Sequence, residues 1–516
     1  MARNYVCTST TPIVQTKAGK LRGFVADGTY TFYGIKYADA KRFQQPTPVK
    51  PWEGVKDALG YGYVCPMLTQ DKPGAGELKV PHRYWPMDEN CQYLNVWTQS
   101  IDKNAKKPVM VWLHGGGFFA GSSIEQVAYE GDALSKFGDI VVVTLNHRLN
   151  ILGYMDLSPF GEKYANSCNA GNADMVAALQ WVHENIAAFG GDPENVTIFG
   201  QSGGGMKVYT LMQTPAADGL FQKGIVMSGV MDRKAEPKAD GTYIVKALME
   251  ELKLKEVEEL ETVPYADLAE AYNKVSPAVA AEGHYIGGAG PAPNDYYLGD
   301  PFVIGFTDHA KTVPLMAGTV LGEFLGFGPG NPNRLTMTDE EAKAMVAAVY
   351  GEHADEAIEL FKKAYPDKTL CELMIIDTVM RPATKKLLDL HAHSTESPTY
   401  SYQFTYTFPI DAGSGPWHCA DIPFVFHNAL RVPVCNLPGV SDRLEHQVSS
   451  AFVNFAKFGN PNDPSLPAWP ACKPGEEPCM IFDENCEVRV NHDDELLKVA
   501  AQYGPQFSFA KTKIEH

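Results

Sequence analysis

The stretch NVTIFGQSGGGMKVY, residues 195–209, constrains the fold of this chain more than any other segment. Residues 196–199 predict a buried strand, and apolar residues at helical spacing resume from Met206 onwards. Between strand and helix lies Ser202, with a glycine two residues before it and two after it. In a tight strand-to-helix turn, side chains at those two positions would collide. The stretch therefore predicts a sharp turn that exposes one serine.

A serine at such a turn is suited to act as a nucleophile. Its hydroxyl reacts poorly unless it is exposed, oriented and partnered by a base. The helix that follows points its N-terminus at the reacting carbonyl, and the backbone N–H of Gly203 can donate to an oxyanion. A phosphate-binding loop is the other reading, but the run lacks the Lys-Ser/Thr ending of a P-loop and is not G-x-G-x-x-G. The pattern is that of the nucleophile elbow, G-x-S-x-G, of α/β-hydrolases.

A second glycine run can supply the remaining oxyanion donors. In VMVWLHGGGFF, residues 109–119, an apolar strand ends in His114 and three glycines. Successive glycines let backbone N–H groups turn inward with no side chain in the way, so we expect Gly116 and Gly117 to be donors. His114 would then shape the loop. A flexible hairpin turn is the alternative interpretation.

The base is expected to be a histidine that follows the serine, because the chain order in this fold is serine, acid, histidine. Among the 14 histidines, His418 lies on a Gly/Pro-rich loop after a strand and is favoured over His427 and His446. His391 and His393 form an H-x-H near a helix end and are expected at the surface.

The acid is expected just beyond the C-terminal end of a buried strand. VPLMAGTVLGEF, residues 313–324, is such a strand with Glu323 in the loop after it. A solvated loop glutamate is the alternative reading. The rival acids are Asp232, Asp295, Asp308 and Asp377.

Alternating strands and helices predict an α/β fold with a mostly parallel sheet covered on both faces. Buried strands are expected at 93–97, 108–117, 139–149, 224–229, 313–318 and 400–408, after an antiparallel opening at 21–63. Helices are expected at 175–190 and 445–457. Helical stretches at about 232–280 and 336–395, the latter opening with a capping box from Thr338 to Glu341, read as insertions over the site that decorate a single domain, residues 1–516.

Composition excludes several classes of function. The net charge of −18 argues against nucleic acid or an anionic membrane as partner, and no apolar run is long enough to span a bilayer. The ten cysteines include no C-x-x-C pair, so neither a zinc site nor any other metal or cofactor is predicted. The N-terminal residues lack the apolar stretch of a secretory signal. We therefore expect a cytoplasmic protein, or a secreted or periplasmic one if a leader has been removed.

Several blocks together resemble the type-B carboxylesterases of the carboxylesterase/cholinesterase family, which are α/β-hydrolases. The resemblance covers nearly the whole chain. The blocks are RFQQPTPVKPWEGVKDA (42–58), DENCQYLNV (88–96), NHRLNILGYM (146–155), FGGDPENVTIFGQSGGG (189–205) and FVNFAKFGNPNDPSLPAWP (452–470).

The resemblance implies Ser202 as nucleophile, Glu323 as acid and His418 as base, in a serine esterase that needs no cofactor. It also implies oxyanion donors at Gly116, Gly117 and Gly203. In secreted members of the family, cysteines matching Cys65 and Cys91 form a disulfide, whereas a cytoplasmic location would leave them reduced.

The chain departs from the family pattern beside the site. Gln201 and Gly203 stand where Glu and Ala are usual, and Gly203 should keep the donor role with more mobility. Val320 and Gly322 replace more usual polar residues, and Phe324 replaces the glycine after the acid. No tryptophan clearly matches the choline-binding position of cholinesterases, which argues against choline esters.

The expected reaction is hydrolysis of short to medium acyl or aryl esters, with a small-molecule ester as substrate. A lipase or an amidase using the same triad is the alternative. A non-catalytic, neuroligin-like interaction domain is disfavoured, because all three triad positions carry competent residues. The sequence makes no prediction of oligomeric state.

Overall fold

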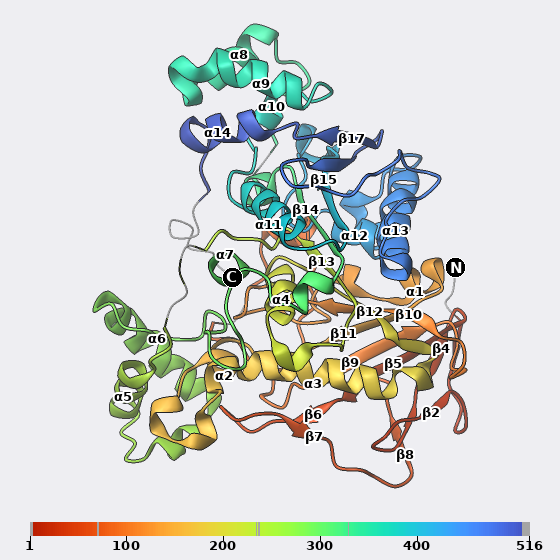
Figure 1. Ribbon diagram of the computed structural model, residues 1–516, viewed down its shortest axis with the longest axis vertical. Helices are drawn as coiled ribbons and strands as arrows, with labels where there is room; N and C mark the ends of the chain where they lie inside the picture. The colour runs from red at the N-terminus through yellow and green to blue at the C-terminus, as the bar shows by residue number, and fades with distance from the viewer. Residues whose placement is uncertain (1–3, 70–71, 234, 236–237, 329, 508–516) are drawn as a thin grey trace.

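The computed structural model describes residues 4–69, 72–233, 235, 238–328 and 330–507 (Figure 1). Its described residues form a central sheet of twelve strands. In spatial order these are β1 (Tyr5–Val6), β4 (Phe24–Ala26), β5 (Thr29–Lys36), β9 (Tyr93–Thr98), β11 (Val141–Leu145), β10 (Lys107–Leu113), β12 (Gly191–Gln201), β13 (Lys223–Met227), β14 (Leu315–Val320), β15 (Thr399–Phe404), β16 (Pro478–Phe482) and β17 (Glu487–Val490). Two smaller sheets contain β2 (Ile13–Gln15), β3 (Lys20–Arg22) and β8 (Val55–Asp57), and β6 (Ala38–Asp39) and β7 (Thr47–Pro48).

The centre of the sheet is parallel, as the sequence predicts. Neighbouring strands from β11 through β16 all run parallel to one another. The predicted antiparallel opening is confirmed, since β4, β5 and β9 pair antiparallel. β9 is also antiparallel to β11, so the parallel part begins one strand later than the change of pattern at residue 93 indicates.

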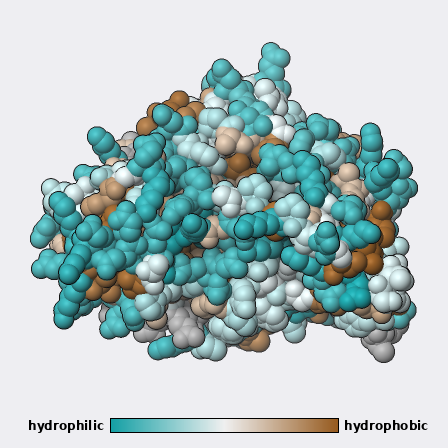
Figure 2. Space-filling model, turned by 90° about the horizontal axis from the view of Figure 1, so that it is seen from below, coloured by the Kyte–Doolittle hydropathy of each residue, from teal (hydrophilic) through white to brown (hydrophobic). Residues whose placement is uncertain are grey.

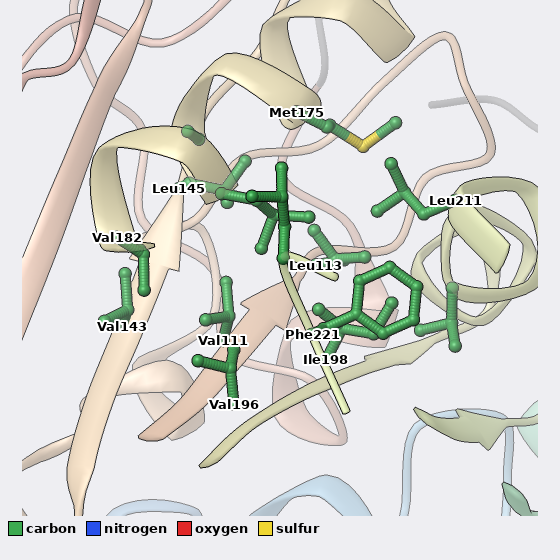
Figure 3. Packing of buried hydrophobic residues seen from close by; sticks show 14 of the residues in the cluster. Val111, Leu113, Val143, Leu145, Met175, Val182, Val196, Ile198, Leu211 and Phe221 are labelled. Atoms are coloured by element: carbon green, nitrogen blue, oxygen red, sulfur yellow. The ribbon is translucent and has the colours of Figure 1, made fainter. Parts of the chain in front are cut away.

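Helices cover both faces of this sheet because its strands are apolar on both sides. In β10, Val109, Val111 and Leu113 face one core, and Met110 and Trp112 face the other. The first core is closed by α3 (Ala170–Asn185), α4 (Gly203–Met212) and α11 (Met380–Ser394). Figure 3 shows residues of β10, β11, β12, α3 and α4 packed in it. The second core is closed by α1 (Asp132–Gly138), α12 (Ile422–Val425) and α13 (Ser441–Phe458).

The two predicted helical insertions lie at opposite ends of the molecule (Figure 1). One contains α5 (Thr242–Glu251) and α6 (Tyr265–Ala281), and the other contains α8 (Asp339–Tyr350), α9 (Ala354–Ala364) and α10 (Leu370–Leu373). The capping box from Thr338 to Glu341 is confirmed by reciprocal hydrogen bonds. The described chain also has α2 (Asn150–Tyr154), α7 (Pro301–Ile304) and α14 (Asp494–Tyr503).

The sequence groups all of 336–395 as one insertion, but in the structure its last helix is part of the layer that covers the sheet. α11 packs on β14 and β15. Its residues Ala383, Leu387 and Leu388 are buried in the first core with the strands. The helix therefore belongs to the layer that covers the sheet, since its apolar stripe is buried against the strands.

The face seen in Figure 2 is mostly hydrophilic, with hydrophobic side chains gathered in small separate groups. Within the part of the chain that the structure describes, no helix has both the length and the apolar character needed to cross a membrane.

Cys65 and Cys91 are buried free thiols. Burial, together with a hydrogen bond to Cys65, raises the pKa of Cys91 well above its ordinary value.

Candidate active site

Ser202 lies in the sharp turn that the sequence predicts. β12 ends at Gln201 and α4 begins at Gly203, and between them Ser202 has φ 58° and ψ −126°. A Cβ on Gly200 would lie 2.5 Å from the carbonyl carbon of Gly204, and one on Gly204 would lie 1.9 Å from the carbonyl oxygen of Leu113. The collision predicted for larger residues at these two positions is thus confirmed. Ser202 itself is partly exposed.

The glycine run after β10 lies against this turn. Gly116 and Gly117 have φ 82° and 61°, values that favour glycine. A Cβ on Gly203 would meet the backbone N, O and Cα of Gly117 at 2.3, 2.3 and 2.4 Å. The two segments expected to donate to an oxyanion are therefore in backbone contact. Close approach, more than mobility, explains why this chain has glycine at position 203.

A buried lysine ties the glycine run to the helix of the turn. Lys207 of α4 is fully buried, and its Nζ donates to the carbonyl oxygen of His114 at 2.8 Å. Burial lowers the pKa of Lys207 to about 7. The Nδ1 atom of His114 lies 2.9 Å from the carbonyl oxygen of Gly115, which agrees with the expected role of His114 in shaping this loop.

Glu323 and His418 are brought together from segments 95 residues apart. The Nδ1 atom of His418 is hydrogen-bonded to Oε2 of Glu323, and its backbone N–H donates to the carbonyl oxygen of Glu323 at 2.9 Å. The other carboxylate oxygen, Oε1, accepts from the Ser228 hydroxyl at 2.6 Å and from the backbone N–H of Val320 at 2.9 Å. Both side chains are buried. One oxygen of the carboxylate is thus held by Ser228 and Val320, and the other is bonded to the imidazole.

The other imidazole nitrogen faces the turn. Nε2 of His418 lies 3.1 Å from the side-chain nitrogen of Gln201, the residue before Ser202. Because Nδ1 donates its proton to Glu323, Nε2 is the acceptor and the Gln201 amide is the donor. The amide oxygen of Gln201 accepts in turn from the Cys419 thiol at 3.3 Å. An imidazole oriented in this way turns its second nitrogen towards the residue that precedes the serine.

Four residues of this region have strained backbone conformations. Ser202, Ser228, Glu323 and Cys419 all have positive φ, at 58°, 44°, 39° and 81°. Non-glycine residues hold such conformations at a cost of about 1–3 kcal/mol each, and they cluster where the surrounding structure fixes a functional geometry. Together with the hydrogen bonds between Ser228, Glu323 and His418, these conformations mark this as the candidate active site.

Aromatic rings cover one face of the imidazole. The ring of Phe324 stacks on that of His418, with centroids 4.2 Å apart and planes at 26°. Phe507, which follows α14, stacks on the outer side of Phe324 at 4.5 Å. The residue that departs from the family pattern after the acid is therefore the one that shields the histidine.

Two further buried carboxyl groups lie near this pair. Burial raises the pKa of Asp421 to about 7, and its Oδ2 accepts from the Tyr402 hydroxyl at 2.9 Å. Burial and the charge of Glu323 raise the pKa of Asp377 to about 7. Asp377 accepts from backbone N–H groups at the start of α11, so this rival acid is engaged in capping.

The remaining rivals lie elsewhere. Asp232 pairs with Lys386, Asp308 pairs with Lys311, and Asp295 is exposed. These three carboxylates point to solvent or to surface lysines.

The other histidines also have different surroundings. Nδ1 of His427 lies 3.2 Å from the Ser449 hydroxyl, and His446 is exposed. His393 is at the surface as expected, but the same expectation for His391 is wrong. That imidazole is fully buried, because α11 packs on the sheet and His391 bonds the Thr399 hydroxyl at 2.6 Å.

Sequence reasoning missed two polar side chains of the site. Ser228 follows β13 and binds Glu323, and the only signal for it was its place after a buried strand. Gln201 stands out in the sequence as a departure from the family pattern, but its contact with His418 was not predicted. Among the side chains that the structure describes, no three His, Cys, Asp or Glu residues are grouped so that they could hold a metal ion.

Known carboxylesterases are similar to this chain over almost its entire length. A sequence model described as the Carboxylesterase family matches residues 10–500. Para-nitrobenzyl esterase of Bacillus subtilis (strain 168) is 33% identical over 500 residues, which cover 94% of this chain and 97% of that protein. Phenmedipham hydrolase of Pseudarthrobacter oxydans is 30% identical over 491 residues, covering 93% and 97%. An esterase from anaerobic Clostridium hathewayi, described as able to hydrolyse aliphatic aromatic polyesters, superposes with a TM-score of 0.93 and 53% identity, covering 96% and 99%.

Proposed function

Since the chain belongs to the carboxylesterase family and is a carboxylic ester hydrolase, we propose that Ser202 is its nucleophile, His418 its base and Glu323 its acid. The observation that best supports this assignment is the hydrogen bond between His418 Nδ1 and Glu323, because it orients Nε2 towards the turn that carries Ser202. A nucleophile, a base and an orienting acid are what acyl transfer through a serine requires.

In the proposed cycle, neutral His418 takes the proton of Ser202 while the serine oxygen attacks the ester carbonyl. The backbone N–H groups of Gly116, Gly117 and Gly203 receive the developing negative charge. Each such donor typically contributes about 10²- to 10³-fold to kcat. The alcohol leaves with the proton from His418, and water hydrolyses the acyl-enzyme by the same route.

Glu323 would keep the imidazole in the required tautomer and stabilise the imidazolium. Its Oε1 is held by Ser228 and by the backbone of Val320, which supports this role despite the unusual residues near the acid. The amide of Gln201 would give up its contact with Nε2 when the Ser202 hydroxyl engages that nitrogen.

For the substrate we propose short to medium acyl or aryl esters. A relative named para-nitrobenzyl esterase supports an ester that carries an aromatic group. The esterase of Clostridium hathewayi extends the proposal to the ester bonds of aliphatic aromatic polyesters. A panel of p-nitrophenyl esters of increasing acyl length, a p-nitroanilide and an aliphatic aromatic polyester film separates these classes. Preferred turnover of long acyl chains would indicate a lipase, and anilide turnover an amidase.

The triad is tested by Ser202→Ala alongside Ser158→Ala, a surface control. We expect the first variant to lose at least about 10⁴-fold in kcat and the second to match the wild type. A fluorophosphonate should label the wild type, and mass spectrometry should map the adduct to Ser202. An adduct on another serine, or an active Ser202→Ala variant, would refute the assignment.

A further inference from the structure

Lys79 inserts its ammonium between two loops that are distant from it in sequence. Only 8% of the residue is exposed. Its Nζ donates to the carbonyl oxygens of Gly326, Phe327 and Gly328 at 3.3, 3.4 and 3.3 Å. It also donates to the Ser414 hydroxyl at 3.2 Å. Three ammonium protons are thus shared among four oxygens.

These oxygens belong to the segments that carry the proposed acid and base. The three carbonyls come from, or directly follow, the 3₁₀ turn Glu323–Phe327, which begins with the acid. Ser414 lies four residues before His418, and the ring of Trp417, immediately before the histidine, lies 5.2 Å from the Lys79 nitrogen. Lys79 therefore touches both loops without touching either Glu323 or His418.

The two loops are packed closely enough for their relative position to matter. The backbone N–H of Gly322 donates to the carbonyl oxygen of Pro416 at 3.1 Å. A Cβ on Gly326 would meet that same oxygen at 2.6 Å and Cα of Trp417 at 2.7 Å. A change in the spacing of the loops would be transmitted directly to the imidazole and the carboxylate.

Electrostatics explains why a cation suits this position. Carbonyls at the end of a helical turn lack partners within the turn and carry partial negative charge. An ammonium satisfies several of them at once, and the ring of Trp417 adds a cation–π contact. Burial lowers the pKa of Lys79, while the charge of Asp411 opposes that effect. Burying an ammonium costs free energy unless such bonds compensate it.

We propose that Lys79 is a positioning residue for ester hydrolysis, whose ammonium holds the Glu323 turn against the His418 loop. The proposal rests on the triad proposed above. Misplacing catalytic groups by about 1 Å can lower the rate by about 10²-fold, so loss of this tie should lower kcat far more than it changes substrate binding.

The test compares Lys79→Met, which keeps the length of the side chain but removes the charge, with Lys79→Arg, which keeps the charge. Lys56→Met is the matched control, because Lys56 also lies over a tryptophan ring, that of Trp52, at 4.2 Å. For Lys79→Met we expect kcat on a p-nitrophenyl ester to fall about 10- to 100-fold with KM within about threefold of the wild type. Lys79→Arg should recover at least a third of wild-type kcat. The control, Lys56→Met, should have the kcat of the wild type.

A structural role alone would lower the melting temperature and leave the kcat of the folded enzyme unchanged, and that result would overturn the proposal. So would Lys79→Arg failing to exceed Lys79→Met. If Lys79→Met does not fold, Ser414→Ala removes one of the four oxygens without stranding a charge. It should lower kcat about two- to fivefold, and wild-type kcat would then overturn the proposal. Ser202→Ala assayed in parallel tells the two proposals apart, since its activity tests the triad alone.

Discussion

Replacing Gly203 by alanine places a methyl group where the backbone of Gly117 already lies. The new Cβ would be 2.3 Å from the Gly117 nitrogen, whereas real Cβ atoms stay at least 3.0 Å from such neighbours. The glycine loop would have to retreat by about 0.7 Å to reach even that limit. Because the obstacle is backbone, no rotation of a side chain can relieve it.

The expected effect on catalysis is large, because a retreat of this size moves the Gly117 N–H away from the position of the oxyanion. Loss of one such donor costs about 10²- to 10³-fold in kcat, or about 2.7–4 kcal/mol of transition-state stabilisation.

The assay is kcat and KM on p-nitrophenyl acetate, with active sites titrated so that kcat refers to folded enzyme. Gly224→Ala is the matched control, because its Cβ would face the same helix but meet side-chain atoms alone, those of Val208, Met212 and Leu315, at 3.2 Å or more. The control should stay within about threefold of the wild type. If Gly203→Ala keeps kcat within twofold, the loop does not donate from the position seen here and the reasoning is wrong.

Three further predictions concern the surroundings of the site. Phe324→Leu keeps an apolar cover but removes the aromatic face over His418, so kcat/KM should fall about two- to tenfold, an aromatic contact being worth about 0.5–1.5 kcal/mol; an unchanged value contradicts this. Burial lowers the pKa of Lys207 to about 7, so the folded protein loses this proton above pH 7, whereas the unfolded chain keeps it up to about pH 10.4. Because the unfolded state then binds more protons, stability measured by urea unfolding should rise from pH 7 to 8 by about 1 kcal/mol more in the wild type than in Lys207→Met. Burial raises the pKa of Asp421 to about 7, so the folded protein keeps a proton that the unfolded chain loses near pH 4. Wild-type stability should therefore fall between pH 5 and 6.5 by about 2 kcal/mol relative to Asp421→Asn. Parallel stability curves for the two proteins would refute this prediction.

Elements with strong local signals were predictable from the sequence. The turn at Ser202 follows from the spacing of its glycines between a strand and a helix, although the backbone that Gly204 approaches, that of Leu113, belongs to a distant strand. The helix at 339–350 follows from its capping box, whose hydrogen bonds lie within one turn. The parallel centre of the sheet follows from uninterrupted apolar strands separated by helices.

The contacts across the site were not predictable in this way. Ser228 binding Glu323, Gln201 facing His418, and Lys79 joining two loops each connect segments between 95 and 335 residues apart. Burial of His391 likewise depended on α11 packing on the sheet. Periodicity and spacing describe the chain near each residue and carry no information on which loops will meet.

The chain by itself therefore determined where the turn at Ser202, the glycine run at 115–117 and the sheet would form, because glycine placement and apolar periodicity are written in the sequence around each of them. Only the tertiary structure decided how Glu323 and His418 are held. Strands that end at the same edge of the sheet bring distant loops together, and the side chains that stabilise them there are selected by that packing.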